Sequence, residues 1–196
     1  EGSVPADATE PEPEPEPEPF TFTVTVLSTS PLFPAPPPPP AEGEDEPAEP
    51  PPRPALKIRY AFPGKPDEPV DEGPFESRDD GAFACDATRT FAFLPATDRP
   101  SITTLLNAPL TLTLSRDDDV AIATARVPFD GFLEGRDEGV VRLESIALTR
   151  VPFEGEGEDD GAAVNDLLPD ATIAVELRSS ELLLTPEEAR AGNVLC

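Results

Sequence analysis

Apolar and polar residues alternate along several short segments of the chain. In FTFTVTVL (20–27) the apolar side chains occupy every second position, with threonines between them. The same period of two runs through ALKIRYAF (55–62) and LTLTL (110–114). This is the period of a β-strand that buries one face, and the residues are the β-branched and aromatic types that strands favour. These segments predict strands that line a hydrophobic core.

Weaker patterns predict the other strands. They lie within FESR (75–78), within GAFACDATRTFAFL (81–94), in the run that resumes with Val120 and Ile122, and in VVRLESIALTRV (140–151) and ATIAVELRS (171–179). In 140–151 the alternation of apolar and polar residues breaks near Ser145, which indicates a β-bulge.

Loops and helices take little of the sequence. The acidic, Pro/Gly-rich stretch 63–73 predicts a loop, and Ser101 is placed to cap one helical turn that ends at Leu106. Near the end of the chain, Thr185 and Glu188 form a capping box that predicts a short helix. About eight strands with so little helix predict an all-β fold, an antiparallel eight-stranded β-sandwich.

Proline and glutamate tracts interrupt this pattern. Of the 29 prolines, 18 precede residue 55, and residues 10–19 alternate Glu and Pro. Such a tract favours the extended polyproline II conformation, because proline cannot donate a backbone hydrogen bond. The five prolines Pro36–Pro40 could dock in an aromatic groove, but a stiff spacer is the favoured interpretation because no basic residue flanks them.

These observations predict a domain organisation. A Pro/Glu-rich extended arm occupies 1–19, and the sandwich occupies 20–179, with a Pro-rich insert at 31–54 and an acidic loop at 154–165. Residues 180–196 are expected to be a linker into a following domain.

Composition restricts the function. The chain has 40 acidic and 14 basic residues, a net charge of −26, so phosphate backbones and anionic membranes repel it. It contains no histidine, which removes every His-based catalytic or metal-ligand set. Cys85 lies in a strand-like run and is expected to be a buried structural thiol. We therefore expect no catalytic residue, no cofactor, no nucleic acid partner and no membrane partner.

Asp117, Asp118 and Asp119 are the candidates for metal ligands, if the chain binds a metal at all. Calcium takes 6 to 8 oxygen ligands, and alternate side chains of an extended segment point apart. A second loop near the first strand would have to contribute carboxylates, but Ser28 to Leu32 reads STSPL. The aspartates are therefore interpreted as the polar turn of a hairpin, with no metal site.

The order of elements resembles that of a C2 domain. The resemblance rests on an F-x-F strand, a short helix and the hairpin LTLTLSR followed by AIATARVPFDGFLEG. With FACDATRTFAFLP (83–95) and TIAVELRSSELLLTPEEARAGNVL (172–195), the chain is similar to the N-terminal region of the cilia- and flagella-associated protein 70 family. The insert at 31–54 departs from the pattern of that family.

This resemblance implies a structural, non-enzymatic component of the ciliary axoneme. Its expected place is a projection of the central apparatus, the C2a projection, where it would support motility by binding other projection proteins. The base of the outer dynein arms is one alternative, and a Ca²⁺- or phospholipid-sensing C2 domain is another. The family also implies tetratricopeptide repeats beyond this segment. Because tubulin is acidic, a domain at −26 is not expected to contact the tubulin lattice directly.

Overall fold

The computed structural model describes most of the predicted sandwich. The described residues are 18–34, 55–94, 98–116, 119–134, 139–152, 167–181 and 183. Most of the arm, the insert from 35 to 54, the acidic loop and the capping box near the C-terminus lie outside these residues.

Eight strands and two short helices form the fold within the described residues. The strands are β1 (Phe20–Thr29), β2 (Ala55–Phe62), β3 (Lys65–Glu76), β4 (Ala84–Phe93), β5 (Leu110–Arg116), β6 (Ala121–Val127), β7 (Val140–Arg150) and β8 (Thr172–Ser179). The helices are α1 (Ile102–Asn107) and the 3₁₀-helix η2 (Asp130–Glu134).

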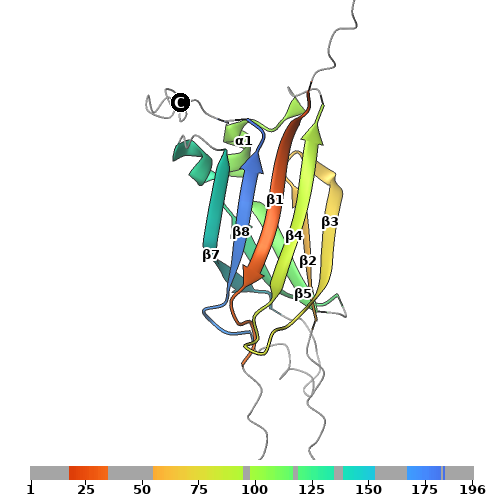
Figure 1. Ribbon diagram of the computed structural model, residues 1–196, viewed down its shortest axis with the longest axis vertical. Helices are drawn as coiled ribbons and strands as arrows, with labels where there is room; N and C mark the ends of the chain where they lie inside the picture. Colours follow the sequence, from red (N-terminus) through yellow and green to blue (C-terminus); the bar gives the residue numbers. More distant parts are fainter. Residues whose placement is uncertain are drawn as a thin grey trace, which may run out of the picture.

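The strands form two four-stranded layers that are joined along one side. Their order is β3-β2-β5-β6-β7-β8-β1-β4, and every pairing is antiparallel. The sheet folds over where β6 meets β7, so that β4-β1-β8-β7 packs against β3-β2-β5-β6 (Figure 1). The prediction of an all-β, antiparallel eight-stranded sandwich is confirmed.

The connections gather at two ends of the sandwich. β1 ends and β2 begins at the lower end in Figure 1, which we call the insert pole because the Pro-rich insert separates these two strands. The pairings of Ser28 with Ala84 and of Leu56 with Arg116 place the β3–β4 and β5–β6 connections at the same pole. Helix α1 and the end of β8 lie at the opposite pole.

Phenylalanine rings join the two layers. Phe22 of β1 and Phe62 of β2 come from different layers, and their ring centroids are 4.9 Å apart. Phe91 of β4 stacks on Phe62 at 4.9 Å, and Phe129 meets both Phe22 and Phe62 edge-on. All four rings are at most 2% exposed. Burial of such rings is the main gain in free energy on folding, and their edge-on contacts add to it.

Two local features predicted from the sequence, a helix cap and a β-bulge, are present in the structure. The Ser101 side chain accepts a hydrogen bond from the backbone N–H of Thr104 at 3.2 Å and caps α1, as predicted. The β7–β8 register shifts between Leu143 and Ile146, which confirms the bulge expected near Ser145.

The prediction of a loop at 63–73 is wrong. Most of this stretch belongs to β3, which pairs with β2. Proline removes a ladder donor, but an edge strand tolerates it where the missing N–H would face solvent, and β3 carries Pro66, Pro69 and Pro74. The strand buries one apolar side chain deeply, Val70, so its sequence lacks the apolar alternation that marks the other strands.

Burial, rather than residue type, should decide the cost of truncating a leucine. Leu112 of β5 is 0% exposed and Leu94 is 63% exposed. We expect Leu112→Ala to lower the free energy of unfolding by about 2–5 kcal/mol, and Leu94→Ala to change it by about 0.5 kcal/mol or less. Urea unfolding followed by circular dichroism measures both; equal losses would mean that the described core is wrong.

Cys85 should make the fold less stable at high pH. Its side chain is buried, and burial together with nearby Asp86 raises the pKa of the thiol to about 12. Above pH 9 the thiol ionises in the unfolded chain but not in the folded one, so stability falls as pH rises, by at most about 1.4 kcal/mol per pH unit. In a Cys196→Ser background, which removes the other cysteine of the chain, Cys85→Ala should reduce this slope. An unchanged slope between pH 9 and 11 in urea titrations would contradict the burial of the thiol.

Candidate functional site

The aspartate turn lies between β5 and β6 at the insert pole. Asp117 and Asp118 lie outside the described residues. Asp119 has a positive φ of 61° and donates its N–H to the carbonyl of Arg116 at 2.9 Å. Its carboxylate lies 2.9 Å from Lys57 Nζ of β2, and this ammonium lowers the pKa of Asp119. The described member of the triplet is thus a turn residue that forms an ion pair across the sheet.

The loop after β1 offers hydroxyl and backbone groups that are already in use. Ser30 and Thr172 are joined by two bonds, Ser30 N to Thr172 O at 2.9 Å and Thr172 N to Ser30 Oγ at 2.8 Å. Leu32 is 0% exposed and closes the core at this pole. Among the residues with described positions, no group of three or more His, Cys, Asp or Glu side chains is arranged to hold a metal ion.

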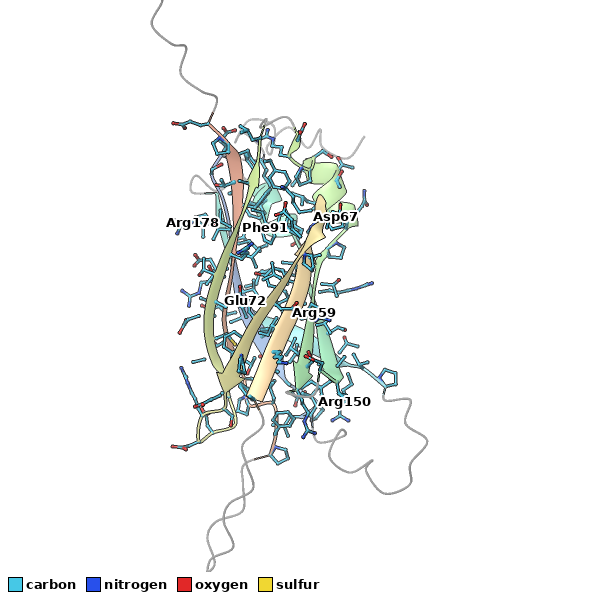
Figure 2. All side chains as sticks on the ribbon, turned by 90° about the vertical axis from the view of Figure 1, so that its right-hand side faces the viewer. Arg59, Asp67, Glu72, Phe91, Arg150 and Arg178 are labelled. Carbon is cyan, nitrogen blue, oxygen red and sulfur yellow. The ribbon has the colours of Figure 1, made fainter. Side chains whose placement is uncertain are left out.

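The sandwich is open along one side, between the edge strands β3 and β4, which end the strand order. We call this region the seam. Figure 2 faces it and shows β3 and β4 close together near their connection and diverging toward the opposite pole. Near that pole, Lys65 Nζ of β3 lies 5.5 Å from the centroid of the Phe93 ring of β4.

Three polar residues occupy the inner faces of the strands at the seam. Glu72 of β3 pairs with Ile58, and Arg89 of β4 pairs with Val24; both apolar partners are fully buried, so their cross-strand neighbours share the inward side. Tyr60 of β2 is the third, 3% exposed, with its ring against Phe91. These three residues come from three different strands.

The Tyr60 hydroxyl is buried without a hydrogen-bond partner in the described structure. Its burial raises the pKa of the phenol; the Glu72 carboxylate raises it further and Arg89 opposes this. A buried hydroxyl that makes no hydrogen bond costs about 1–3 kcal/mol, so this position is costly for the isolated domain.

Carboxylates line β3. Asp71 is 2.6 Å from Arg59 Nε, and Glu68 is 2.8 Å from Lys65 Nζ. Asp67, Glu72 and Glu76 form no ion pair within the part of the chain that the structure describes. The rim of the seam is therefore negatively charged on the side of β3.

Sequence reasoning missed the seam. Most of β3, residues 65–73, was expected to be a loop, and only its end was predicted as a strand within FESR (75–78), so most of its carboxylates could not be placed beside β4. The isolated Val70 in an otherwise polar segment was the one signal of a strand with a buried face. The alternation in 55–62 places Tyr60 on the inward face of its strand, but no sequence pattern shows whether its hydroxyl has a hydrogen-bond partner there.

None of the helices in the described residues is long and apolar enough to cross a membrane. A search of curated proteins finds no match. Among solved structures, one described as "CC2D1B coordinates ESRCT-III activity during the mitotic reformation of the nuclear envelope" matches at 13% identity with a TM-score of 0.49. The match covers 87% of this chain, which spans 59% of that one. A likeness of this strength carries no conclusion here.

The family comparison is more extensive. Residues 17–194 match the model of the cilia and flagella-associated protein 70 N-terminal domain. The match includes every strand described above and agrees with the resemblance found in the sequence. The chain therefore belongs to the family of the cilia and flagella-associated protein 70 N-terminal domain.

Proposed function

We propose that this domain is a non-enzymatic binding module that holds proteins together in the ciliary or flagellar axoneme. The observation that carries the proposal is the family match over residues 17–194, since the family is associated with cilia and flagella. More specifically, we propose that the domain lies in a projection of the central apparatus, the C2a projection. There it supports motility by binding other projection proteins.

The physical features of the domain favour binding over catalysis. With a net charge of −26 and no histidine, the chain suits basic protein surfaces better than acid–base chemistry near neutral pH. The same charge disfavours direct binding to the acidic tubulin lattice. The partners proposed here are therefore other proteins of the projection, with tubulin reached through them.

Localisation in cilia tests the proposal. We expect the full-length protein that contains this domain, fused to a fluorescent tag, to lie along the centre of the axoneme in expansion microscopy. Deleting residues 20–179 should remove density from a central-apparatus projection in subtomogram averages, and beating should slow. Density lost at the bases of the outer dynein arms would favour that location instead. A protein found outside cilia would exclude the proposal.

Calcium should not stabilise the domain. A sensor site with a Kd of about 10 µM would add about 2.7 kcal/mol at 1 mM Ca²⁺, which raises Tm by about 5–10 °C. We expect a change in Tm of less than about 1 °C in 1 mM Ca²⁺ compared with EDTA, because Asp119 is held by Lys57 and the residues directly after β1, Ser30 to Leu32, contain no carboxylate.

A variant separates a real site from a nonspecific ion effect. If calcium raises Tm by several degrees, and Asp117→Asn with Asp118→Asn removes the rise, the aspartate turn binds calcium and the sensor alternative is correct. A rise that the double variant keeps would reflect general screening of the acidic surface.

A further inference from the structure

The hydrogen bonds of β1 determine which backbone groups of β4 are free. Thr21 exchanges two bonds with Ser180 beyond the end of β8, Ser180 N to Thr21 O at 2.9 Å and Thr21 N to Ser180 Oγ at 2.9 Å. The backbone of Thr21 is thus directed toward β8. Backbone direction alternates along a strand, so Thr23 and Thr25 also face β8, while Phe22 and Val24 face β4.

The free groups of β4 follow from this alternation. Thr23 is opposite Thr90 and Thr25 is opposite Thr88, and the facing hydroxyls are 3.0 and 3.1 Å apart. In an antiparallel pair of this non-hydrogen-bonded kind, the N–H and C=O groups of both residues point away from each other. Thr88, Thr90 and, by the same alternation, Ala92 therefore direct their backbone donors and acceptors toward the seam.

The two edges of the seam differ in how they are protected. Proline, charge and bulges are the usual means by which edge strands avoid pairing with another chain. β3 has three prolines and register shifts against β2. β4 has no proline, and its regular stretch from Ala87 to Phe93 contains one charged residue, Arg89. No described strand pairs with this side of β4, so it is the edge open to strand addition.

The charge at the seam determines which kind of segment could be added to β4 as a further strand. β3 carries five carboxylates and one lysine, whereas β4 carries one aspartate and one arginine. A segment laid along β4 would lie next to β3, where Asp67 and Glu72 have no ion pair within the described residues. Figure 2 shows Glu72 between β3 and β4, and Asp67 near the upper end of β3. Lysine or arginine side chains on the added strand would therefore be attracted, and acidic ones repelled.

Other occupants fit less well. The Glu-Pro repeat of residues 10–19 has proline at every second position and is acidic, so it neither forms a ladder nor suits β3. A second copy would bring together two chains that each carry a net charge of −26. A basic extended segment of another protein suits both the backbone and the charge of the seam.

We propose that the free edge of β4, from Thr88 to Ala92, binds an extended, basic segment of a partner protein by β-strand addition. This inference rests on the proposed role as a binding module and names its partner class. The added strand pairs with the backbone of the three residues whose groups point into the seam. Its basic side chains lie beside the β3 carboxylates.

A pair of synthetic peptides tests strand addition. The probe is an acetylated, amidated eight-residue peptide that alternates lysine and valine; in the control, proline replaces each valine, which keeps the charge but prevents a ladder. Tyr60 is the single tyrosine and the chain has no tryptophan, so tyrosine fluorescence reports on Tyr60 alone. We expect saturable binding of the probe to the 196-residue chain, at least tenfold tighter than the control.

Amide hydrogen exchange locates the bound peptide. In the free protein, the amides of Thr88, Thr90 and Ala92 should exchange fast, and those of Arg89 and Phe91 slowly, because only the latter bond to β1. Saturation with the probe should slow the first three at least tenfold and leave the other two unchanged. Uniform protection along β4, or none, would overturn the proposal.

Two variants separate the edge from general charge attraction. Thr90→Pro removes one free N–H and should weaken probe binding at least tenfold, while Thr90→Ala keeps the N–H and should stay within twofold. Should Thr90→Pro melt before the assay temperature, the pair Asp67→Asn and Glu72→Gln replaces it. That pair should weaken binding at least threefold, whereas Glu144→Gln with Asp170→Asn, which removes two charges elsewhere, should not.

The remaining outcomes each decide the question. Equal binding of probe and control peptide, or of Thr90→Pro and the unchanged chain, would mean charge attraction without a ladder and would overturn the proposal. So would a dimer in light scattering that Thr90→Pro abolishes, since the edge would then be taken by a second copy. Because ciliary localisation is measured without the peptide, the proposed function can fail or succeed separately from strand addition.

Discussion

The contact between the phenylalanines of β1 and β2 holds the two layers together. Strands of the same layer are joined by backbone hydrogen bonds. Across the sandwich, the described parts of the two layers share side-chain packing, the β6–β7 junction and the isolated bridge between Ser77 and Phe83 next to β3 and β4. The Phe22 and Phe62 rings meet at 4.9 Å, and Phe91 and Phe129 surround them. This cluster fixes how far apart the layers lie, and so fixes where the two edge strands lie relative to each other.

For strands that bury one face in the core, the sequence alone was enough to predict which residues point inward. The alternation in β1, β2 and β5 predicted the inward residues correctly, because any slip by one residue would turn Phe22 or Leu112 toward water. The bulge near Ser145 and the cap at Ser101 could also be predicted, since each depends on a local pattern. These features are set within a few residues of the chain.

For features that depend on pairing between distant segments of the chain, the sequence alone was not enough to predict the structure. β3 forms because β2 offers it a ladder, and its many prolines and carboxylates are tolerated because one side of the strand faces solvent. Asp119 was correctly interpreted as a turn residue, but its ion pair with Lys57 depends on the β2–β5 register. The seam is difficult to predict for two reasons. It depends on β3, most of which was expected to be a loop, and on which backbone groups of β4 point away from β1.

The neighbouring positions of β1 and β8 have a mechanical consequence. These strands are antiparallel neighbours, and the start of β1 lies beside the end of β8, as the pairing of Phe22 with Ser179 shows. Tension applied to the chain on both sides of the domain would therefore load the β1–β8 hydrogen bonds one after another, starting at this end. It would not load them all together in shear. The domain should yield at low force by peeling open from this end, while the connections at the insert pole stay unloaded until the ladder has parted.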